Sequence, residues 1–424
     1  MIHQFLTSIN YISNHPVLEY NKKHKELYLR GIGEFLYNVD NNSSTLRFCF
    51  DQLCENLIGE KYPEGWNTTG NLRYVNKAQK LQRKGFSFFR LNDSFWWDVF
   101  NIISVSQLNS QISGKRITEL SNGFVKSKKA KKIIKDAREY FQGNGEGKKL
   151  NYLLRQYSDE NIKFLSDKIK RILVVGTMSA GKSTLINALV GEKITKVKNS
   201  ACTNKIAFFY NRPYNDIIVY SDGYTYGVSK EFSDDFAEKK HVSLKFNSSF
   251  NSKPYIIIDS PGVDFAYDES HKKITYDFLN QGFYDTILCV INAPYIERDG
   301  ENTLIKEILK IKNKEIIFIL NQLDRFDPTD DSIEVTYKQF KKFLKENNYN
   351  AKIIPFSARL AYLIKKGNSE IPLTNQEQLD LKNLKERMSS IFYYLGMYYT
   401  GICSHEEDFF ARSGLTSLES ELMK

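Results

Sequence analysis

The sequence is poor in the features that stabilise secreted or zinc-binding folds. Its five cysteines are odd in number and scattered, and no Cys-x-x-Cys pair occurs: Cys49, Cys54, Cys202, Cys289 and Cys403. A disulfide framework or a zinc site is therefore not expected, because both need cysteines at paired spacings. A reducing compartment, the cytoplasm, is the better expectation.

Long apolar runs are missing as well. No stretch approaches the roughly 18 uninterrupted apolar residues of a membrane-spanning helix. The first residues, MIHQFLTSINYISNHP, lack the basic start and the apolar centre of a signal peptide. Any contact with a membrane is therefore expected to be peripheral, at its inner face.

Positive charge and aromatic side chains are plentiful. The 424 residues carry 60 Lys and Arg against 50 Asp and Glu, a net charge of +10, and include 26 Tyr and 29 Phe. A basic surface favours anionic partners such as membrane headgroups or nucleic acid. A lysine-rich solvated surface explains the excess more simply, so we do not expect a nucleic-acid partner.

The stretch RILVVGTMSAGKSTLINALV, residues 171–190, is typical of a buried strand, a loop and a helix. The loop fits G-x-x-x-x-G-K-[ST], a pattern whose backbone N–H groups and following helix N-terminus bind phosphate. Lys182 is expected to reach the β- and γ-phosphates of a nucleotide, and Ser183 to ligate Mg²⁺. The predicted nucleotide contacts in this stretch are Gly176, Met178, Ser179, Ala180, Gly181, Lys182, Ser183 and Thr184.

A second motif, Asp-Ser-Pro-Gly, closes the apolar run IIID at residues 259–262. A carboxylate at Asp259 can hold Mg²⁺ through water, and the Gly262 N–H can bond the γ-phosphate, so the following loop senses hydrolysis. Thr203 lies between this motif and the phosphate loop. A threonine there can close on Mg²⁺ and position the attacking water, although one threonine is a weak signal by itself.

Two further loops predict the choice of base. Asn321-Gln-Leu-Asp324 follows the apolar run IIFIL. The Asp324 carboxylate can accept from guanine N1–H and the N2 amino group, donors that adenine lacks, so it selects GTP over ATP. Asn321 is expected to tie this loop to the phosphate loop. After the run IIPF, a backbone N–H at Ser357 or Ala358 can read guanine O6.

In this order, the five motifs resemble those of the GTPase family, and specifically of the bacterial branch of the dynamin superfamily. The resemblance covers residues 168–363, with a closing helix expected at 415–423, and rests on Ser-Ala-Gly-Lys-Ser and Asp-Ser-Pro-Gly. It implies that GTP or GDP and Mg²⁺ are bound, and that Ser179 helps to hold a monovalent cation, K⁺ or Na⁺. It also implies a GTP-dependent dimer, with a second copy or with a partner dynamin-like chain.

Three departures from that family are visible. Gln322 stands where a lysine usually packs over the guanine, and Met178 stands where many dynamins carry glutamine. Dynamins also place a helical stalk after the GTPase domain, whereas here residues 1–167 precede it. The helical module is therefore expected at the N-terminus, unless the chain is a fragment or assembles with partner chains.

The chain is expected to have two parts. Residues 1–167 contain no nucleotide motif and look mainly helical, with a helix from Leu46 that ends near Gly59. Core packing is favoured over a binding surface for the aromatic stretch 85–105. Residues 168–424 are typical of an α/β fold with a mostly parallel central sheet, with a helical insertion at about 365–412.

Several elements are expected within these parts. The strands are predicted at residues 172–175, 206–210, 217–220, 242–246, 254–258, 286–291, 316–320 and 353–356. Helices are predicted at residues 152–169, 268–280, 301–311 and 332–346. An aromatic helical stripe from Leu384 to Tyr399 is more consistent with core packing than with a dimer or partner surface.

The sequence therefore predicts a GTPase that hydrolyses GTP to GDP and phosphate. No general base stands out, so catalysis is expected to come from positioning and charge stabilisation by Ser179, Lys182, Thr203 and Gly262. A dynamin-like protein would couple dimerisation to remodelling of a membrane or a partner. The alternatives are a slow nucleotide-gated switch that regulates a partner protein, and a GTPase associated with nucleic acid.

Overall fold

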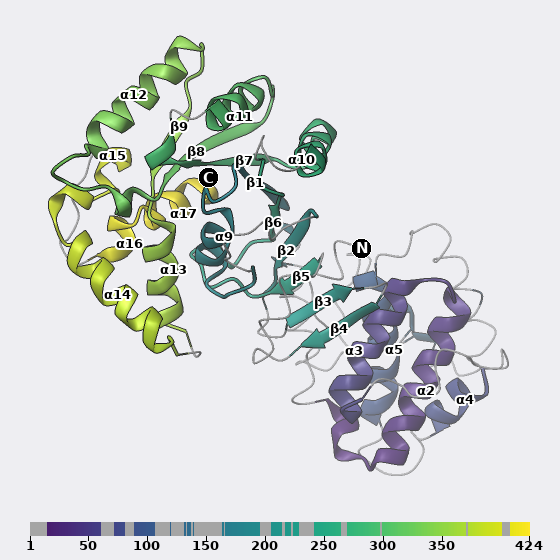
Figure 1. The fold of residues 1–424 in the computed structure, drawn as a ribbon. Helices are drawn as coiled ribbons and strands as arrows, with labels where there is room; N and C mark the ends of the chain where they lie inside the picture. The colour runs from purple at the N-terminus through teal and green to yellow at the C-terminus, as the bar shows by residue number, and fades with distance from the viewer. Residues whose placement is uncertain are drawn as a thin grey trace. The chain divides into compact units, whose positions relative to one another are not determined.

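The strand β1 (Lys170–Gly176) lies in the middle of the central sheet of this computed structural model (Figure 1). Its last five residues are buried and mostly aliphatic, as a strand covered on both faces requires. Its neighbours β6 (Tyr255–Asp259) and β7 (Thr286–Asn292) both run parallel to it. The parallel half of the sheet continues with β8 (Glu315–Asn321) and β9 (Lys352–Pro355).

The other half of the sheet is mixed in direction. β2 (Ala207–Asn211) pairs antiparallel with β6 and parallel with β5 (His241–Leu244), and β3 (Ile217–Ser221) pairs antiparallel with β5. Within the second unit the strand order is β3-β5-β2-β6-β1-β7-β8-β9. The predicted α/β fold with a mostly parallel sheet is confirmed. One strand, β4 (Tyr224–Val228), was not expected, because its short run contains a glycine and follows an Asp-Gly turn signal.

Helices cover both faces of this sheet, and Figure 1 shows α10, α11 and α12 on one side and α9 and α13 on the other. Their bounds are α9 (Lys182–Val190), α10 (Glu269–Gln281), α11 (Asp299–Leu309), α12 (Ile333–Glu346) and α13 (Ala358–Gly367). The helices predicted at 268–280, 301–311 and 332–346 are thus present. The closing helix α17 (Leu415–Met423) has its predicted bounds.

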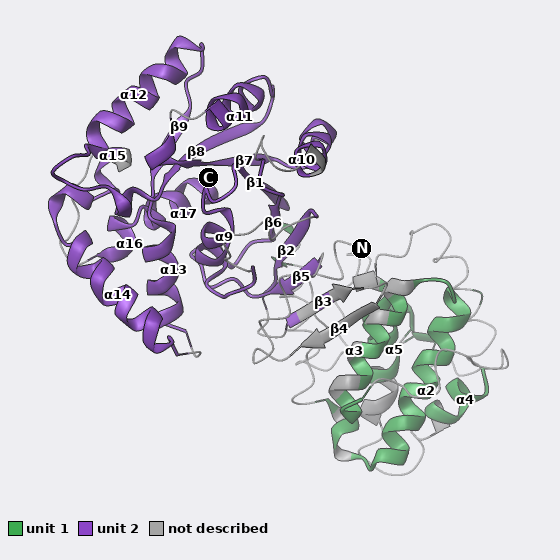
Figure 2. Ribbon diagram, viewed as in Figure 1, with its two compact units in different colours: residues 1–166, 225–227 green, residues 167–224, 228–424 purple. Residues whose placement is uncertain are grey.

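The chain divides into two units (Figure 2), one of residues 1–166 with 225–227 and the other of 167–224 with 228–424. The structure describes residues 15–60, 72–80, 89–106, 166–195, 205–213, 217–221, 224–228, 241–263, 269–296, 299–369, 372–400 and 408–424, and runs of one to three residues between 119 and 164. Most of the helix predicted at 152–169 lies outside these ranges. No helix among the described residues is long and apolar enough to cross a membrane.

The first unit is helical where it is described. Its elements are η2 (Pro16–Glu19), α2 (Lys22–Val39), α3 (Ser44–Ile58), α4 (Arg73–Lys80) and α5 (Phe89–Ser106). Gly59 follows α3 with φ +79°, the left-handed conformation that often ends a helix. Trp96 and Trp97 are fully buried in α5, so the core-packing interpretation of this stretch is confirmed for both.

The aromatic stripe from Leu384 to Tyr399 is not one helix, and this expectation was wrong. α14 (Asn375–Met388) ends early, and two short helices follow, η8 (Ile391–Tyr393) and α15 (Met397–Thr400). The break has a local cause, since the Ser390 side chain accepts from the N–H of Phe392 and starts a new turn. Ile391 is therefore 72% exposed, whereas Tyr393 and Leu395 are buried.

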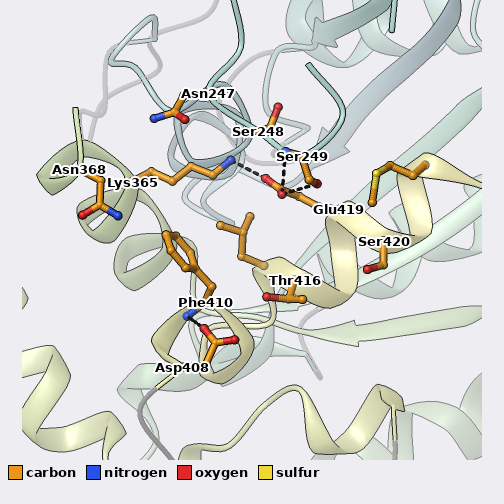
Figure 3. A pocket seen from close by; sticks show the side chains of 12 residues that line it. Asn247, Ser248, Ser249, Lys365, Asn368, Asp408, Phe410, Thr416, Glu419 and Ser420 are labelled. Carbon is orange, nitrogen blue, oxygen red and sulfur yellow. Dashed lines mark hydrogen bonds and ion pairs between the residues drawn. The ribbon is translucent and has the colours of Figure 1, made fainter. Parts of the chain in front are cut away.

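The closing helix α17 is joined to the rest of its unit at a pocket of about 530 Å³ (Figure 3). There Glu419 accepts from the Lys365 ammonium with one oxygen and from the N–H and hydroxyl of Ser249 with the other. Lys365 also donates to the carbonyl of Leu189 near the end of α9. Burial lowers the pKa of Lys365, and the Glu419 carboxylate opposes that shift.

Replacing Glu419 by Gln is expected to destabilise the chain by about 3 kcal/mol, because it leaves the Lys365 charge buried without its counter-charge. The free energy of unfolding of the whole chain in urea measures this. The double change Lys365→Met with Glu419→Leu removes both charges and should cost less. Glu386→Gln, at an exposed position of α14, is the control. A Glu419→Gln chain as stable as this control would contradict the prediction.

Candidate functional site

The predicted motifs that the structure describes, all but Thr203, meet at one edge of the sheet, because parallel strands place their carboxyl ends together. The loop after β6 touches the loop after β1, where the N–H of Val263 donates to the carbonyl of Gly176 at 3.2 Å. The loop after β8 touches the same phosphate loop through Asn321. Three of the predicted motifs are therefore in direct contact, although they are far apart in sequence.

The Asn321 side chain makes two hydrogen bonds that hold this arrangement. Its amide nitrogen donates to the carbonyl of Ala180 at 2.8 Å, and its oxygen accepts from the N–H of Ala358 at 3.0 Å. The residue is 1% exposed, so neither bond competes with water. The expected link between the Asn321 loop and the phosphate loop is thus present, and it extends to Ala358 at the start of α13.

The phosphate loop leaves no room for a side chain at Gly181. This residue has φ +96°, and a Cβ there would lie 2.2 Å from the amide nitrogen of Asn321. Gly262 is also tightly packed, since its Cβ would lie 3.1 Å from the Lys182 ammonium and 3.2 Å from the backbone nitrogen of Met178. The glycine of the second motif therefore lies directly against the phosphate loop and its lysine.

Lys182 is buried at the first turn of α9 and is 8% exposed. Its ammonium donates to the carbonyls of Gly176 and Thr177 at 3.1 and 3.0 Å. Burial lowers the pKa of Lys182, while the carboxylates of Asp259 and Glu301 oppose the shift. The site thus holds a lysine among carbonyl and carboxylate groups, close to the glycine that follows β6. Ser183 and Thr184 follow it in α9.

Asp259 ends β6 and is 1% exposed. The next residue is anchored to the central strand, because the Ser260 hydroxyl donates to the carbonyl of Val174 at 2.8 Å. Pro261 is anchored from α10 by the Thr275 hydroxyl, at 3.1 Å. The start of this loop is therefore fixed on two sides up to Gly262. Thr203 and residues 264–268 lie outside the described residues.

Asp324 lies in the short helix η7 (Leu323–Arg325) and is 8% exposed. Burial raises the pKa of its carboxyl, while a hydrogen bond with Ser357 and the charges of Arg325 and Arg387 oppose the shift. Ser357 also caps the N-terminus of α13, where its hydroxyl accepts from the N–H of Leu360. Asp324 and Ser357, predicted from separate strands, are thus in contact.

Ser179 has an unusual backbone conformation and a side-chain contact from the loop after β8. Ser179 has φ +62° and is exposed, and its carbonyl accepts from the side-chain amide of Gln322 at 2.6 Å. Gln322 stands where a lysine usually packs over the guanine, and a glutamine can still pack there. In this structure its side-chain amide adds a second link, beside that of Asn321, between the two loops.

Sequence reasoning missed two residues of the site. Glu301, in the first turn of α11, is 2% exposed and accepts from the Thr177 hydroxyl at 2.6 Å and from the N–H of Asn292 at 3.3 Å. Asn292 could have been found, because it ends an apolar strand as Asp259 and Asn321 do. Glu301 could not, since an acidic residue in a first helical turn is common on any helix.

Replacing Gly181 by Ala is expected to weaken nucleotide binding by roughly 10- to 100-fold. A left-handed backbone costs about 1–3 kcal/mol for other residues, and about 1.4 kcal/mol is tenfold in affinity. The added methyl group would also push against the Asn321 amide. Titration with a fluorescent GTP analogue measures the change. Gly367→Ala is the control, since its Cβ would be 3.4 Å from the nearest atom. Equal affinities in both variants would contradict this account of the loop.

Comparison with known proteins agrees with this geometry. The family model of the 50S ribosome-binding GTPase matches residues 171–322. The bacterial dynamin-like protein of Nostoc punctiforme is 23% identical over 212 residues, which cover 44% of this chain and 30% of that protein. GTPase Era of Clostridium perfringens is 27% identical over 193 residues, 45% of this chain and 50% of that protein. This chain therefore spans less than a third of the length of its dynamin-like relative.

A solved structure of an oligomerised bacterial dynamin pair matches 99% of this chain and 74% of its own, at 17% identity and a TM-score of 0.36. The curated relatives include a bacterial dynamin-like protein, as the motifs predict, and the matching family model is that of a GTPase. This chain carries a GTPase domain at residues 171–322 and is similar to the bacterial dynamin-like GTPases.

Proposed function

We propose that the chain binds GTP with Mg²⁺ and hydrolyses it to GDP and phosphate, using the loops at the carboxyl edge of the sheet. The observation that carries this proposal is the pair of Asn321 hydrogen bonds, which unite the phosphate loop with the loops after β8 and β9. A phosphate-binding loop and a base-selecting loop that are joined through one buried amide suit a single nucleotide.

The residues present fit a nucleotide and its metal. The phosphate loop has a left-handed glycine before α9, so the chain can turn its backbone N–H groups and the helix N-terminus toward an anion. Lys182 would neutralise the β- and γ-phosphates. Oxygen ligands suit Mg²⁺, and Ser183, Thr203 and Asp259 would hold it, Asp259 through water. The metal would supply charge stabilisation to the phosphates.

The chain's own contribution to hydrolysis is positioning. The Gly262 N–H would hold the γ-phosphate, since this residue lies against Lys182 and Met178. Thr203 would position the attacking water, and Ser179 would help to hold a K⁺ or Na⁺ ion. No side chain is needed as a strong general base, because phosphoryl transfer depends mainly on alignment and charge. Met178, in place of a glutamine, favours slow turnover by a single copy.

The base would be recognised by the loops after β8 and β9. Asp324 would accept from guanine N1–H and the N2 amino group. The N–H groups of Ser357 and Ala358, which the sequence offers for O6, instead donate to the Ser413 carbonyl at 2.9 Å and to the Asn321 side-chain oxygen at 3.0 Å. The hydrogen bond of Ser357 with Asp324 supports the role of Asp324, because it favours the ionised carboxylate that would accept from the base. ATP would leave a buried carboxylate without donors, and that is the source of selectivity.

We further propose that GTP drives dimerisation, with a second copy or with a partner dynamin-like chain, and that the resulting motion acts on a membrane or a partner. Similarity to the bacterial dynamin-like protein supports this role, and a net charge of +10 would favour an anionic membrane surface. In this account residues 1–167 form the helical module that the GTPase domain drives.

A slow regulatory switch is the second candidate. Similarity to GTPase Era favours it, as does Met178 in the phosphate loop. Such a protein would bind a partner in one nucleotide state and hydrolyse GTP slowly without remodelling a membrane. If that partner were RNA, its retention would fall steeply with salt.

The rate of phosphate release per molecule, measured against protein concentration, separates these functions. A dimerising GTPase completes its site with a second copy, so its specific rate is expected to rise at least tenfold from nanomolar to micromolar protein. Lys182→Ala, which removes the phosphate-binding ammonium, is the inactive control. A slow rate that stays flat with concentration would exclude the dimerisation proposal and leave the switch.

Co-sedimentation with anionic and neutral liposomes tests the membrane role on the same preparation. Binding to anionic liposomes that increases with a non-hydrolysable GTP analogue is expected. Binding that is absent, or equal with and without nucleotide, would remove the membrane part of the proposal while leaving GTP hydrolysis untouched.

A further inference from the structure

The segment after α13 packs against the loop that carries Asp324. Its helix α14 contacts η7 directly, and it also contacts the short helix η8. The sequence predicts this segment only as an insertion and assigns it no function in the nucleotide site. Its contacts with the base-selecting loop suggest such a function.

Two side chains of the segment hold backbone carbonyls of that loop. The Arg387 guanidinium donates to the carbonyl of Asp324 at 3.2 Å, and the Tyr393 hydroxyl donates to the carbonyl of Phe326 at 2.7 Å. Tyr393 is 2% exposed, so its bond is protected from water, whereas Arg387 is exposed and contributes less. The charge of Arg387 also acts on the Asp324 carboxylate itself.

Arg412 holds the part of the segment that lies between Arg387 and Tyr393. Arg412 is 5% exposed and donates to the carbonyls of Met388 and Ser390 at 2.9 and 3.1 Å, on either side of the break between α14 and η8. Its guanidinium also lies 5.3 Å from the centre of the Tyr394 ring. Arg387 and Tyr393 therefore project from a turn that has little freedom to move.

The loop that they hold has other anchors near its start, since the N–H of Leu323 donates to the carbonyl of Phe356 at 3.5 Å and Ser357 bonds the Asp324 carboxylate. η7 is a single 3₁₀ turn, preceded by Gln322 in the left-handed conformation and followed by extended backbone at Phe326. Asn321 and Gln322 attach its start to the phosphate loop. From Asp324 onward, the backbone carbonyls of Asp324 and Phe326 accept hydrogen bonds from Arg387 and Tyr393, respectively.

We propose that Arg387 and Tyr393 are positioning residues for guanine recognition. They hold the Asp324 carboxylate at the place and angle where it can accept two donors from the base. This inference rests on the proposed GTP-binding function, and it assigns guanine selectivity in part to the 365–412 segment. Two parallel bonds to one carboxylate depend strongly on its orientation, so a small rotation of η7 would cost selectivity before phosphate binding.

The test compares GTP with inosine triphosphate, which keeps N1–H and O6 but lacks the N2 amino group. In the double variant Arg387→Met with Tyr393→Phe, the Kd for GTP is expected to rise about tenfold and that for inosine triphosphate about threefold or less. The KM for GTP should follow its Kd, with kcat within about twofold of the wild type. Arg359→Met is the control, because Arg359 joins α13 to α14 through Asp380 and makes no described hydrogen bond to a carbonyl of the base-selecting loop.

Three outcomes separate the possibilities. A lower preference for GTP over inosine triphosphate in the double variant, but not in Arg359→Met, supports the inference. Equal weakening for both nucleotides, or none, overturns it while GTP binding by the wild-type chain stands. A wild-type chain that binds GTP no better than ATP overturns the proposed function and this inference with it. Tyr393→Phe alone, which loses one oxygen atom, should show the same direction if the double variant folds poorly.

Discussion

The buried amide of Asn321 is the interaction on which the site depends. Its nitrogen and its oxygen are both used, one on the phosphate loop and one at the start of α13, so the residue fixes two loops at once. Gly181 is needed for the same reason, because a side chain there would displace the amide. An asparagine suits this position better than an aspartate or a leucine, since only an amide both donates and accepts with one planar group. The geometry of phosphate and base recognition is thereby set by one side chain.

The helices that begin at the site carry this arrangement through the unit. α9 begins with Lys182 and α13 with Ala358, and both end at the opposite side, where Lys365 joins the end of α9 to Glu419 of α17. A buried polar side chain therefore joins the elements at each edge, Asn321 at the nucleotide edge and Lys365 at the opposite one. Apolar packing of the sheet holds the layers together, and these polar links set their register.

Much of the fold and of the site could be predicted from the sequence. The strands β6, β7 and β8 are largely apolar runs that end in Asp259, Asn292 and Asn321. Their burial and the position of their polar last residues can therefore be predicted from the sequence alone. What could not be predicted depends on contacts across the fold. In the sequence Glu301 looks like any acidic residue in the first turn of a helix, and only the fold brings the Thr177 hydroxyl to it. The hydrogen bond from the Gln322 side chain to the phosphate loop likewise depends on the fold. The stripe ending at Tyr399 has a helical period, but Ser390 and the carbonyl bonds of Arg412 break it into separate turns.

The most direct measurement of the central claim is calorimetric titration of the whole chain with GTP and with ATP, each in the presence of Mg²⁺. If the loops joined by Asn321 form one guanine-selective site, GTP should bind with a stoichiometry of one per chain and ATP at least about 100-fold more weakly, because Asp324 is buried and adenine offers it no donor. Equal affinities for the two nucleotides, or binding of neither, would contradict the account.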